Sequence, residues 1–378
     1  MKRVILIVLN NFKNDSRVLK EAISLQNAGF DVQVVALHEA GLKEFETIKN
    51  IPVYRIKLKS RNWSKNKAVQ LLKYLEFLYR VSKEFKDVDI VHCNDLNALP
   101  AGILIKVFHK DTKIVYDAHE YEINDKPNQS RWSIRLKYLL EKILIKYAKR
   151  VITVSDSIAS EYVKLYGIKK PALVLNTPPY TIIEKKDFFR ENLGIGKEKR
   201  IFLYQGALSY GRGVEILLET FKFLEREKVH QPCIVFMGYG PLEDLIKEAS
   251  RKYANIYFHE AVDPDILLDF TSSADCGISM IEDSCLSYRY SLPNKLFEYI
   301  MAEIPVIVSN LPEMKRLVIE HKIGVVAKEN SIEAIKEAIK DVLKFNRVQL
   351  QENIQRVKKI YNWEKQERIL QKLYKELL

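Results

Sequence analysis

Residues 200–225 read RIFLYQGALSYGRGVEILLETFKFLE, and this stretch decides the fold class. It opens with the apolar run Arg200–Gln205, turns through a glycine-rich loop and ends in the amphipathic stretch Val214–Glu225. These three patterns in this order predict one strand, one loop and one helix. Because such units repeat along the chain, we predict an α/β protein whose parallel sheets are covered by helices on both faces.

The same alternation runs through both halves of the chain. In the first half we predict a helix at Ser16–Ala28 and strands at Val4–Leu9, Val32–Leu37, Asp89–Cys93, Lys113–Asp117 and Arg150–Ser155. In the second half we predict helices at Val214–Glu225, Pro241–Lys252 and Pro293–Ala302, and strands at Arg200–Gln205, Cys233–Gly238, Asn255–Glu260, Asp275–Met280, Ile304–Ser309 and Gly324–Ala327. The tail from Ser331 to Leu378 is predicted to be helical, with a break near Tyr361–Trp363.

The chain of 378 residues is long enough for two domains. The stretch Asn176–Tyr180 contains the consecutive prolines Pro178 and Pro179, which cannot continue a helix or donate to a sheet. We therefore predict a boundary near residue 182, with doubly wound domains at residues 1–182 and 183–362. Such sheets bind ligands at the carboxyl ends of their strands, so the expected site is a cleft between two facing sheets.

The composition excludes several classes of protein. With 47% hydrophobic and 29% charged residues, the chain has the balance of a folded soluble protein. No apolar run reaches the roughly 18 to 20 residues of a membrane-spanning helix, so we expect neither a signal peptide nor such a helix. The four cysteines form no CxxC pair and have no histidine at metal-ligand spacing. This pattern predicts a reducing, cytoplasmic location and no zinc site.

The stretch Ser291–Tyr299, SLPNKLFEY, carries the most informative chemistry. Pro293 fits the first turn of a helix, where free backbone amides and the ammonium of Lys295 make an anion site. Glu298 lies one turn after Asn294, where its carboxylate can accept hydrogen bonds from vicinal hydroxyls. A phosphate beside a diol is what a nucleotide sugar presents. The alternative is a capped helix whose Lys295 and Glu298 are only solvated.

Two glycine-rich loops follow predicted strands of the second half. The first, Tyr204–Gly213, lets the backbone approach an anion and offers the guanidinium of Arg212 to phosphate oxygens. The second, Met237–Pro241, could line the same crevice. Each loop could equally be an ordinary strand-to-helix connection. The glycines concerned are Gly206, Gly211, Gly238 and Gly240.

Two polar stretches follow predicted strands of the first half. Asn10–Arg17 has more polar side chains than a plain turn requires, although Asp15 or Ser16 could simply cap the next helix. Tyr116–Glu120 puts His119 at the expected cleft edge, where an imidazole can donate to a sugar hydroxyl or a phosphate oxygen. The alternative for His119 is a surface histidine hydrogen-bonded to a neighbouring carboxylate.

The motifs of other enzyme classes are absent. The chain lacks GxGxxG after its first strand, GxxxxGK[ST] and GxSxG, which excludes common dinucleotide-binding, P-loop and hydrolase signatures. No Asp-x-Asp pair ends a predicted strand, so we expect no bound divalent metal.

Taken together, the motifs resemble the GT-B glycosyltransferases, specifically the retaining family 4, also described as glycosyl transferases group 1. The resemblance covers nearly the whole chain and rests on five motifs in order: Asn14–Val18 with Lys20–Ala22, Tyr116–Glu120, Tyr204–Gly213, Gly238–Pro241 and Ser291–Tyr299. It implies two Rossmann-like domains facing each other across a cleft, with a last helix at 363–378 crossing back onto the first domain. The first domain would bind the acceptor, and the second the nucleotide-sugar donor.

The same resemblance implies roles for single residues. Arg212 and Lys295 would hold the donor diphosphate and Glu298 the ribose hydroxyls. His119 would contact the transferred sugar and phosphate, so the implied catalytic residues are His119, Arg212 and Lys295. The donor-binding set is Gly206, Gly211, Arg212, Gly238, Gly240, Val262, Leu292, Asn294, Lys295 and Glu298. The acceptor-side set is Asn11, Asp15, Arg17, His119 and Glu120.

One position departs from the family. Members often carry a glutamate eight positions before the ribose-binding one, and here that position is Tyr290. Either Glu282 or Asp283 would replace it, or backbone amides around Leu292 would hold the sugar. The base, the sugar and the acceptor stay undecided.

The resemblance and the charge pattern together predict a retaining, metal-independent enzyme without a cofactor. As the nucleoside diphosphate leaves, Arg212, Lys295 and the amides near Pro293 would stabilise the charge on its phosphate. The sugar would pass from a UDP- or GDP-sugar to a glycan or lipid-linked acceptor in envelope or polysaccharide biosynthesis. The alternatives are a non-catalytic GT-B subunit that binds nucleotide sugar or glycan beside a partner enzyme and, more remotely, a nucleotide-sugar 2-epimerase.

The positive charge is confined to the first half of the chain. Residues 1–180 hold 31 Lys and Arg against 19 Asp and Glu, so the whole net charge of +12 lies there. The segments Lys67–Lys86 and Ser130–Arg150 interleave basic and apolar residues, as membrane-surface helices do. We therefore expect peripheral contact with the inner face of a membrane and no nucleic-acid binding, since RNA-module signatures are missing. The alternative is that both helices simply cover the sheet.

Overall fold

The computed structural model describes all of residues 1–378, which fold into two compact units. Unit 1 comprises Met1–Asp125, Gln129–Leu175 and Gln366–Leu378, and unit 2 comprises Lys126–Asn128 and Asn176–Lys365. The main division falls between Leu175 and Asn176, directly before the double-proline stretch and seven residues before the position expected from the sequence.

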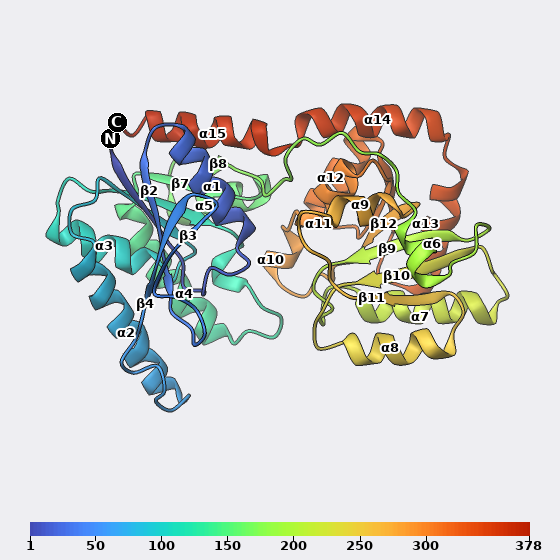
Figure 1. Ribbon diagram of the computed structural model, residues 1–378, viewed down its shortest axis with the longest axis horizontal. Helices are drawn as coiled ribbons and strands as arrows, with labels where there is room; N and C mark the ends of the chain where they lie inside the picture. Colours follow the sequence, from blue (N-terminus) through green and yellow to red (C-terminus); the bar gives the residue numbers. More distant parts are fainter. The chain divides into compact units, whose positions relative to one another are not determined.

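Unit 1 is built on one eight-stranded sheet. Its strands are β1 (Arg3–Ile7), β2 (Asp31–Leu37), β3 (Phe45–Ile48), β4 (Ile51–Ile56), β5 (Ile90–Asn94), β6 (Lys113–Ala118), β7 (Arg150–Thr153) and β8 (Ala172–Leu173). They lie in the order β3-β4-β2-β1-β5-β6-β7-β8, and all neighbours are parallel except β3 and β4. The sheet is accompanied by α1 (Ser16–Asn27), α2 (Lys67–Glu84), α3 (Leu99–Phe108), α4 (Arg131–Leu144), α5 (Asp156–Tyr166) and α15 (Trp363–Lys375), and by the short 3-10 helices η1 (Glu122–Asn124) and η2 (Ile145–Tyr147) (Figure 1).

Unit 2 contains a six-stranded sheet in which every neighbouring pair is parallel. Its strands lie in the order β11 (Ile256–His259), β10 (Pro232–Met237), β9 (Arg200–Gln205), β12 (Cys276–Ser279), β13 (Val306–Val308) and β14 (Gly324–Val326). Its helices are α6 (Phe188–Leu193), α7 (Val214–Arg226), α8 (Glu243–Lys252), α9 (Leu267–Ser272), α10 (Leu286–Arg289), α11 (Asn294–Met301), α12 (Pro312–His321), α13 (Ile332–Lys344) and α14 (Arg347–Ile360) (Figure 1).

Helix α7 shows how unit 2 closes its core. Its buried positions include Leu217, Phe221 and Leu224, which recur every three or four residues and so lie on one face of the helix. They join Phe202 of β9 and Phe236 of β10 in one buried apolar cluster. Each such side chain contributes about 1.5 to 3 kcal/mol when it is removed from water. This packing fixes the carboxyl end of β9, where the candidate site begins.

The predicted fold class is confirmed. Each strand and helix that the sequence analysis placed by its bounds is present within two residues of each end, and both sheets are doubly wound. The helical tail is also present and is broken at Tyr361 and Asn362, between α14 and α15. Crossovers between parallel strands explain this success, because each strand and each helix leaves its own periodicity in the sequence.

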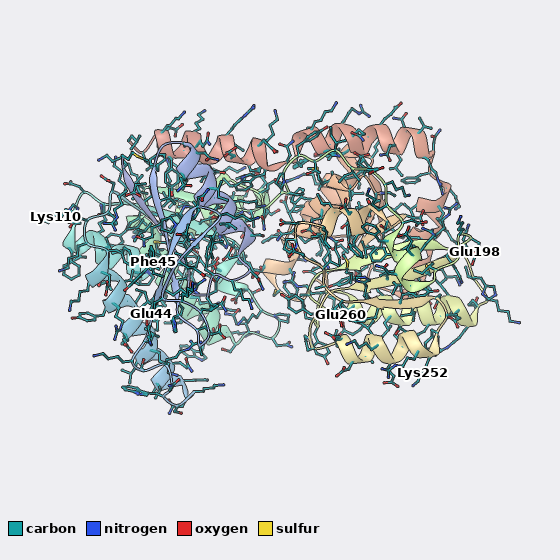
Figure 2. All side chains as sticks on the ribbon, in the orientation of Figure 1. Glu44, Phe45, Lys110, Glu198, Lys252 and Glu260 are labelled. Atoms are coloured by element: carbon teal, nitrogen blue, oxygen red, sulfur yellow. The ribbon has the colours of Figure 1, made fainter.

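The hairpin of β3 and β4 was not predicted from the sequence. Its two-residue turn consists of Lys49 and Asn50, with φ angles of 47° and 67°. Such left-handed turns usually carry Asn-Gly or Asp-Gly, so Lys-Asn gave little signal. The hairpin lies at the edge of the sheet, where Phe45 is 58% exposed and Glu44 forms an ion pair with Lys57 (Figure 2).

The last helix, α15, packs on unit 1. Tyr374 is fully buried, its ring meets that of Phe30 edge-on, and its hydroxyl lies 2.8 Å from Nδ1 of His92. The side-chain amide of Gln371 donates to the carbonyl of Ser24 at 3.2 Å. The crossing of the C-terminal helix back to the first part of the chain is therefore confirmed, and the two termini lie side by side (Figure 1).

None of the helices combines the length and the apolar character needed to span a lipid bilayer. The four cysteines are buried and form no disulfide bond.

Candidate functional site

The predicted loops of unit 2 meet at the carboxyl ends of β9 and β10. The amide of Gly206 donates to the carbonyl of Met237 at 2.9 Å, and the amide of Leu208 donates to that of Tyr239 at 2.9 Å. At Gly238, with φ of 156°, an added Cβ would stand 1.9 Å from the carbonyl oxygen of Gly206, which only glycine avoids. The two glycine-rich loops are thus held against one another.

The start of helix α11 lies against the same loop. The ammonium of Lys295 stands 3.5 Å from the centre of the Tyr204 ring. A Cβ built on Gly206 would lie 3.9 Å from the same nitrogen. Pro293 precedes the helix with φ of −71° and ψ of 145°, and no side chain caps the first turn. The helix therefore begins with uncapped amides beside a cation, as an anion site requires.

Arg212 and Lys295 form a pair of neighbouring cations whose repulsion is only partly offset by Glu298. Neither side chain forms an ion pair, and the Arg212 guanidinium stacks over the ring of Tyr288 at 4.6 Å. Burial, and then the charge of Arg212, lower the pKa of Lys295 to about 7, against the smaller opposing effect of Glu298. An anion placed between the two would remove their repulsion, so this loop is built to receive one.

The carboxylate of Glu298 is positioned by a chain of hydrogen bonds. The side-chain amide nitrogen of Gln205 donates to Oε2 of Glu298, and the Thr271 hydroxyl lies 2.9 Å from the amide oxygen of Gln205. Gln205 and Thr271 are buried, whereas Glu298 is partly exposed. Glu298 is therefore held in a fixed, partly exposed position on α11, three residues after Lys295.

The remaining donor-side residues border this loop. Gly211 lies next to Tyr288, because a Cβ added there would stand 2.9 Å from the Tyr288 ring, and its carbonyl accepts from the Glu282 amide at 3.0 Å. Leu292 and Val262 are half-buried, and Asn294 is exposed. Gly240 follows β10, and Val262 lies in the loop after β11 together with Glu260 (Figure 2).

The structure also shows the surroundings of Tyr290, the position where the family often has a glutamate. Tyr290 ends helix α10, and its amide donates to the carbonyl of Leu286 at 3.0 Å. Asp283 forms an ion pair with Arg289 at 3.0 Å, so its charge is already compensated. Of the two acids that the sequence offered as replacements, Glu282 is the one attached by its backbone to the glycine-rich loop.

In unit 1, His119 stands between two carboxylates after the end of β6. Its Nε2 lies 3.2 Å from Oδ2 of Asp117, and its Nδ1 lies 3.4 Å from Oδ1 of Asp95. Burial lowers the pKa of this imidazole, but Asp95 and Asp117 outweigh it and raise the pKa to about 9. His119 is accordingly an imidazolium near neutral pH, with 20% of its side chain exposed.

Arg17 is placed differently from the acceptor-side position expected for it. Its guanidinium is buried, contacts both oxygens of Asp117 at 2.7 to 3.0 Å, and donates to the carbonyl of Val174 at 2.8 Å. A third contact joins it to Glu21 at 3.1 Å. Arg17 therefore reaches no solvent-borne acceptor directly, and its place is that of a support for Asp117 and, through it, for His119.

The other acceptor-side residues are partly engaged in local structure. Asp15 caps helix α1, since it accepts from the amide of Val18 at 3.2 Å. This is the alternative that the sequence had left open for that residue. The side-chain amide of Asn11 donates to Glu39. Asn11 and Glu120 are both half-buried.

Glu21, His92 and Asp117 cluster closely enough to be considered as metal ligands. Their ligand atoms all lie within 4.8 Å of one another, and all three residues are buried. However, the guanidinium of Arg17 already contacts both carboxylates. Because that cation supplies the positive charge that the cluster needs, we assign no metal to it.

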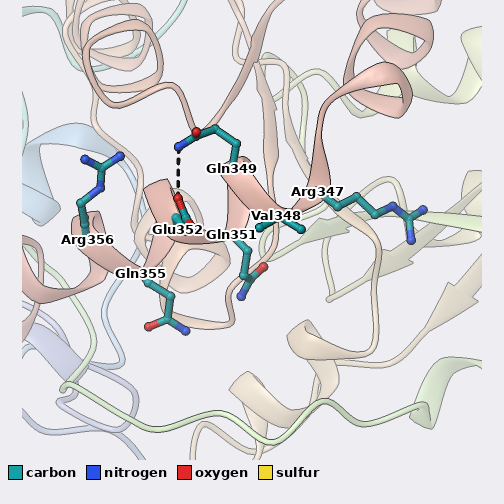
Figure 3. Close-up of a pocket in the computed structure, with 7 residues that line it drawn as sticks. All are labelled: Arg347, Val348, Gln349, Gln351, Glu352, Gln355 and Arg356. Atoms are coloured by element: carbon teal, nitrogen blue, oxygen red, sulfur yellow. Dashed lines mark hydrogen bonds between the residues drawn. The ribbon is translucent and has the colours of Figure 1, made fainter.

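A shallow hollow on unit 2 contains none of the predicted residues (Figure 3). Helix α14 alone lines it, with Arg347, Val348, Gln349, Gln351, Glu352, Gln355 and Arg356. We assign it no function.

Sequence reasoning missed several side chains that support the site. Asp95 directly follows β5 and so carries the same sequence signal as His119, a polar residue at the carboxyl end of a strand. Gln205, Thr271 and Tyr288 gave no signal, since they contribute only through contacts with residues distant in sequence.

Comparison with known proteins agrees with this architecture. Residues 16–177 match the family model described as Glycosyltransferase Family 4, and residues 185–359 match the model described as Glycosyl transferases group 1. The chain is 23% identical over 355 residues to chitobiosyldiphosphodolichol beta-mannosyltransferase of Kluyveromyces lactis, covering 84% of this chain and 77% of the relative. It is 23% identical over 338 residues to the putative teichuronic acid biosynthesis glycosyltransferase TuaC of Bacillus subtilis, covering 83% and 81%.

Solved structures show the same fold. The sucrose-phosphate synthase of Thermosynechococcus elongatus superposes with a TM-score of 0.79 at 16% identity, over 100% of this chain and 99% of that chain. The HepE protein of Anabaena, in complex with UDP and glucose, superposes with a TM-score of 0.75 at 14% identity, with the same coverage. On the family models, the relatives and the fold, the chain belongs to the GT-B glycosyltransferases of the family 4 type.

Proposed function

We propose that this protein transfers a sugar from a nucleoside-diphosphate sugar to a glycan or lipid-linked acceptor. The observation that carries this proposal is the pair Arg212 and Lys295, two cations beside the loop after β9 whose repulsion Glu298 only partly offsets. A diphosphate supplies the missing charge, and Glu298, one turn further along α11, is placed to accept from the ribose hydroxyls. Unit 2 is then the sugar-donor unit, and unit 1, with His119, is the acceptor unit.

The catalytic roles follow from charge. Departure of the nucleoside diphosphate builds negative charge on the phosphate next to the sugar, and a preorganised guanidinium and ammonium stabilise it. Lys295 and Arg212 can do this together with the uncapped amides of α11, so we propose that no metal is required. His119, as an imidazolium, can donate to a sugar hydroxyl or a phosphate oxygen. UDP- and GDP-sugars are the proposed donors.

A ligand screen tests the sugar-donor site. A ligand that binds only the folded state raises the melting temperature by mass action. We expect UDP or GDP, and the matching nucleotide sugar, to raise the melting temperature of the purified chain equally with magnesium and with EDTA. A shift that appears only with magnesium would contradict metal independence. No shift with any nucleotide would contradict the assignment of the site.

Retention of the anomeric configuration is a separate part of the proposal. We propose that the acceptor attacks from the face that the phosphate leaves, with that phosphate as the base, as the resemblance to the retaining glycosyltransferases implies. One relative is named a beta-mannosyltransferase, and a β-product from an α-linked nucleotide sugar would mean inversion. The one-bond C–H coupling at the new anomeric carbon distinguishes the two. An α-product from an α-linked donor is expected, and a β-product would overturn retention.

The acceptor and the location are proposed on weaker grounds. Relatives named for teichuronic acid biosynthesis and for a dolichol-linked substrate favour an envelope polysaccharide or a lipid-linked glycan. The net charge of +12, all within residues 1–180, favours work in the cytoplasm at the anionic inner face of a membrane.

A non-catalytic GT-B subunit is the second candidate. Tyr290 favours it, because the glutamate common at that position in the family is missing. Such a subunit would bind nucleotide sugar and yet release no nucleoside diphosphate with any acceptor. If the purified chain alone releases nucleoside diphosphate in the presence of an acceptor, this second candidate is excluded.

A further inference from the structure

A buried carboxylate anchors helix α4 to unit 1. Glu141 is the one buried side chain of this helix, and its carboxylate accepts from the hydroxyls of Tyr116, Tyr162 and Tyr166 at 2.5, 2.7 and 2.6 Å. Burial raises the pKa of Glu141, although all three phenols oppose the rise. The inner face of α4 is therefore held by these hydrogen bonds and by the half-buried Ile134, Tyr138 and Leu144, and the remaining apolar side chains lie on the outer face.

The outer face carries a continuous apolar stripe. Its members recur every three or four residues, so they share one side of the helix and of the turn that follows. The α4 stripe consists of Trp132 (80% exposed), Leu136 (60%), Leu139 (53%), Leu140 (45%), Ile143 (58%) and Tyr147 (51%). No other part of the chain covers it. An exposed apolar surface of this length marks an interaction site more often than a plain surface.

A basic flank runs beside the α4 stripe. It consists of the exposed residues Arg131, Arg135, Lys142, Lys146 and Lys149, none of which forms an ion pair. The one acidic residue of the helix, Glu141, is buried on the opposite side. Lys137, the remaining basic residue of α4, bonds Asp125 at 2.7 Å instead. The positive charge beside the stripe is therefore uncompensated.

A second apolar surface lies on the neighbouring helices. Helix α2 exposes Leu71, Leu72, Leu75 and Tyr79, and α3 packs against both α2 and α4. Unit 1 therefore exposes apolar side chains on α2 as well as on α4.

We propose that the α4 stripe and its basic flank dock unit 1 onto an anionic lipid bilayer. Apolar side chains on a basic helix fit the boundary between headgroups and acyl chains, and Trp132 is suited to that boundary. A second copy of this chain fits less well, because two-fold pairing of the stripe would bring the unpaired cations of both flanks together. The inference deepens the membrane part of the proposed function and rests on it, since a bilayer-bound enzyme meets a lipid-linked acceptor directly.

Vesicle co-sedimentation of the full chain tests this surface. Vesicles of phosphatidylcholine are compared with vesicles containing about one third phosphatidylglycerol, at low and high salt. We expect binding to the anionic vesicles only, weakening as salt rises, with a blue shift of tryptophan fluorescence that is lost in Trp132→Phe. Each basic residue replaced in Arg135→Gln/Lys146→Gln/Lys149→Gln should weaken binding about fivefold.

Two further variants separate the explanations. Trp132→Ser/Leu136→Ser/Ile143→Ser removes exposed apolar groups only and should abolish the fluorescence shift and most binding. Lys315→Gln/Lys340→Gln/Lys359→Gln removes the same charge from exposed positions of unit 2 and should bind as the wild type does. Equal loss in both charge variants would reduce the effect to net charge and overturn the proposal.

Two other results would also contradict docking onto a bilayer. Binding to neither vesicle, or a dimer in sedimentation velocity that the serine variant dissolves, would overturn the bilayer as the occupant. The melting-temperature response to UDP and GDP is measured on the same variants. A retained nucleotide shift with lost vesicle binding, or the reverse, shows which of the two proposals has failed.

Discussion

Raising the pH from 7 to 9 should weaken binding of the nucleotide sugar by about tenfold for each pH unit. Burial and Arg212 lower the pKa of Lys295 to about 7 in the free protein. A bound diphosphate favours the ammonium and returns the pKa towards its ordinary value near 10.4, so binding takes up a proton. The affinity is therefore constant below pH 7 and falls as the pH rises above it.

Calorimetric titration between pH 6 and 9 measures this effect, with buffers of different ionisation enthalpy to count the proton. The nucleotide sugar is preferred to the free diphosphate, because it has no phosphate proton to lose in that range. Lys295→Arg keeps its charge and should show no such pH dependence. A flat profile for the wild type would contradict the role given to Lys295.

Replacing Asp117 by Asn should lower the free energy of unfolding of unit 1 by about 3 to 5 kcal/mol, since it leaves the buried guanidinium of Arg17 without its main counter-charge. Burial raises the pKa of Asp117, but Arg17 and His119 outweigh it and hold the pKa well below its ordinary value. The stabilising contribution is thus present above pH 4 and is lost as the pH falls below it.

Hydrogen exchange of the β5 and β6 amides in increasing urea measures this free energy for unit 1. Asp95→Asn is the matched control, because Asp95 also faces His119 but is 38% exposed. It should change the stability by less than about 1 kcal/mol while lowering the pKa of His119 in NMR titration. Similar losses in both variants would show that the Arg17–Asp117 pair has no special weight.

The fold could be predicted from the sequence because each strand and each helix of a parallel βα unit has its own local hydrophobic periodicity. The restart at Arg200–Gln205 and the double proline at Pro178 and Pro179 divided the chain close to where the structure divides it. Periodicity does not report edge pairing, which is why the hairpin with the Lys49-Asn50 turn was missed. Tertiary context, and not local preference, decides such strands.

Only part of the candidate site could be predicted from the sequence. Arg212 could be proposed because its loop follows a strand end, where a doubly wound sheet binds its ligand. Lys295 and Glu298 could be proposed because they lie in the first turns of a predicted helix. Arg17 was placed on the acceptor side by the resemblance, and its pairing with Asp117 could not be seen because Asp117 lies 100 residues further along the chain. A charged residue in a polar stretch looks the same from sequence whether it faces solvent or a buried carboxylate.

The side chains that hold the site residues in place could not be predicted from the sequence. Thr271 and Gln205 act on Glu298 from different elements, and no local sequence pattern marks them.

Helix α4 is the opposite case, because a local sequence pattern did mark it. Its pattern left open a membrane-surface helix or a helix that covers the sheet, and the structure shows that Trp132 and Leu136 are exposed and do not cover the sheet.

The central claim is that the loop of Arg212 and Lys295 binds the diphosphate of a nucleotide sugar. Calorimetric titration of UDP and GDP into the wild type, Arg212→Ala and the exposed control Arg251→Ala tests it most directly. Two charge-assisted hydrogen bonds lost with Arg212 should weaken binding on the order of 100-fold, and Arg251→Ala should bind as the wild type does. Undiminished binding by Arg212→Ala would contradict the site, and with it the account of how this protein holds its sugar donor.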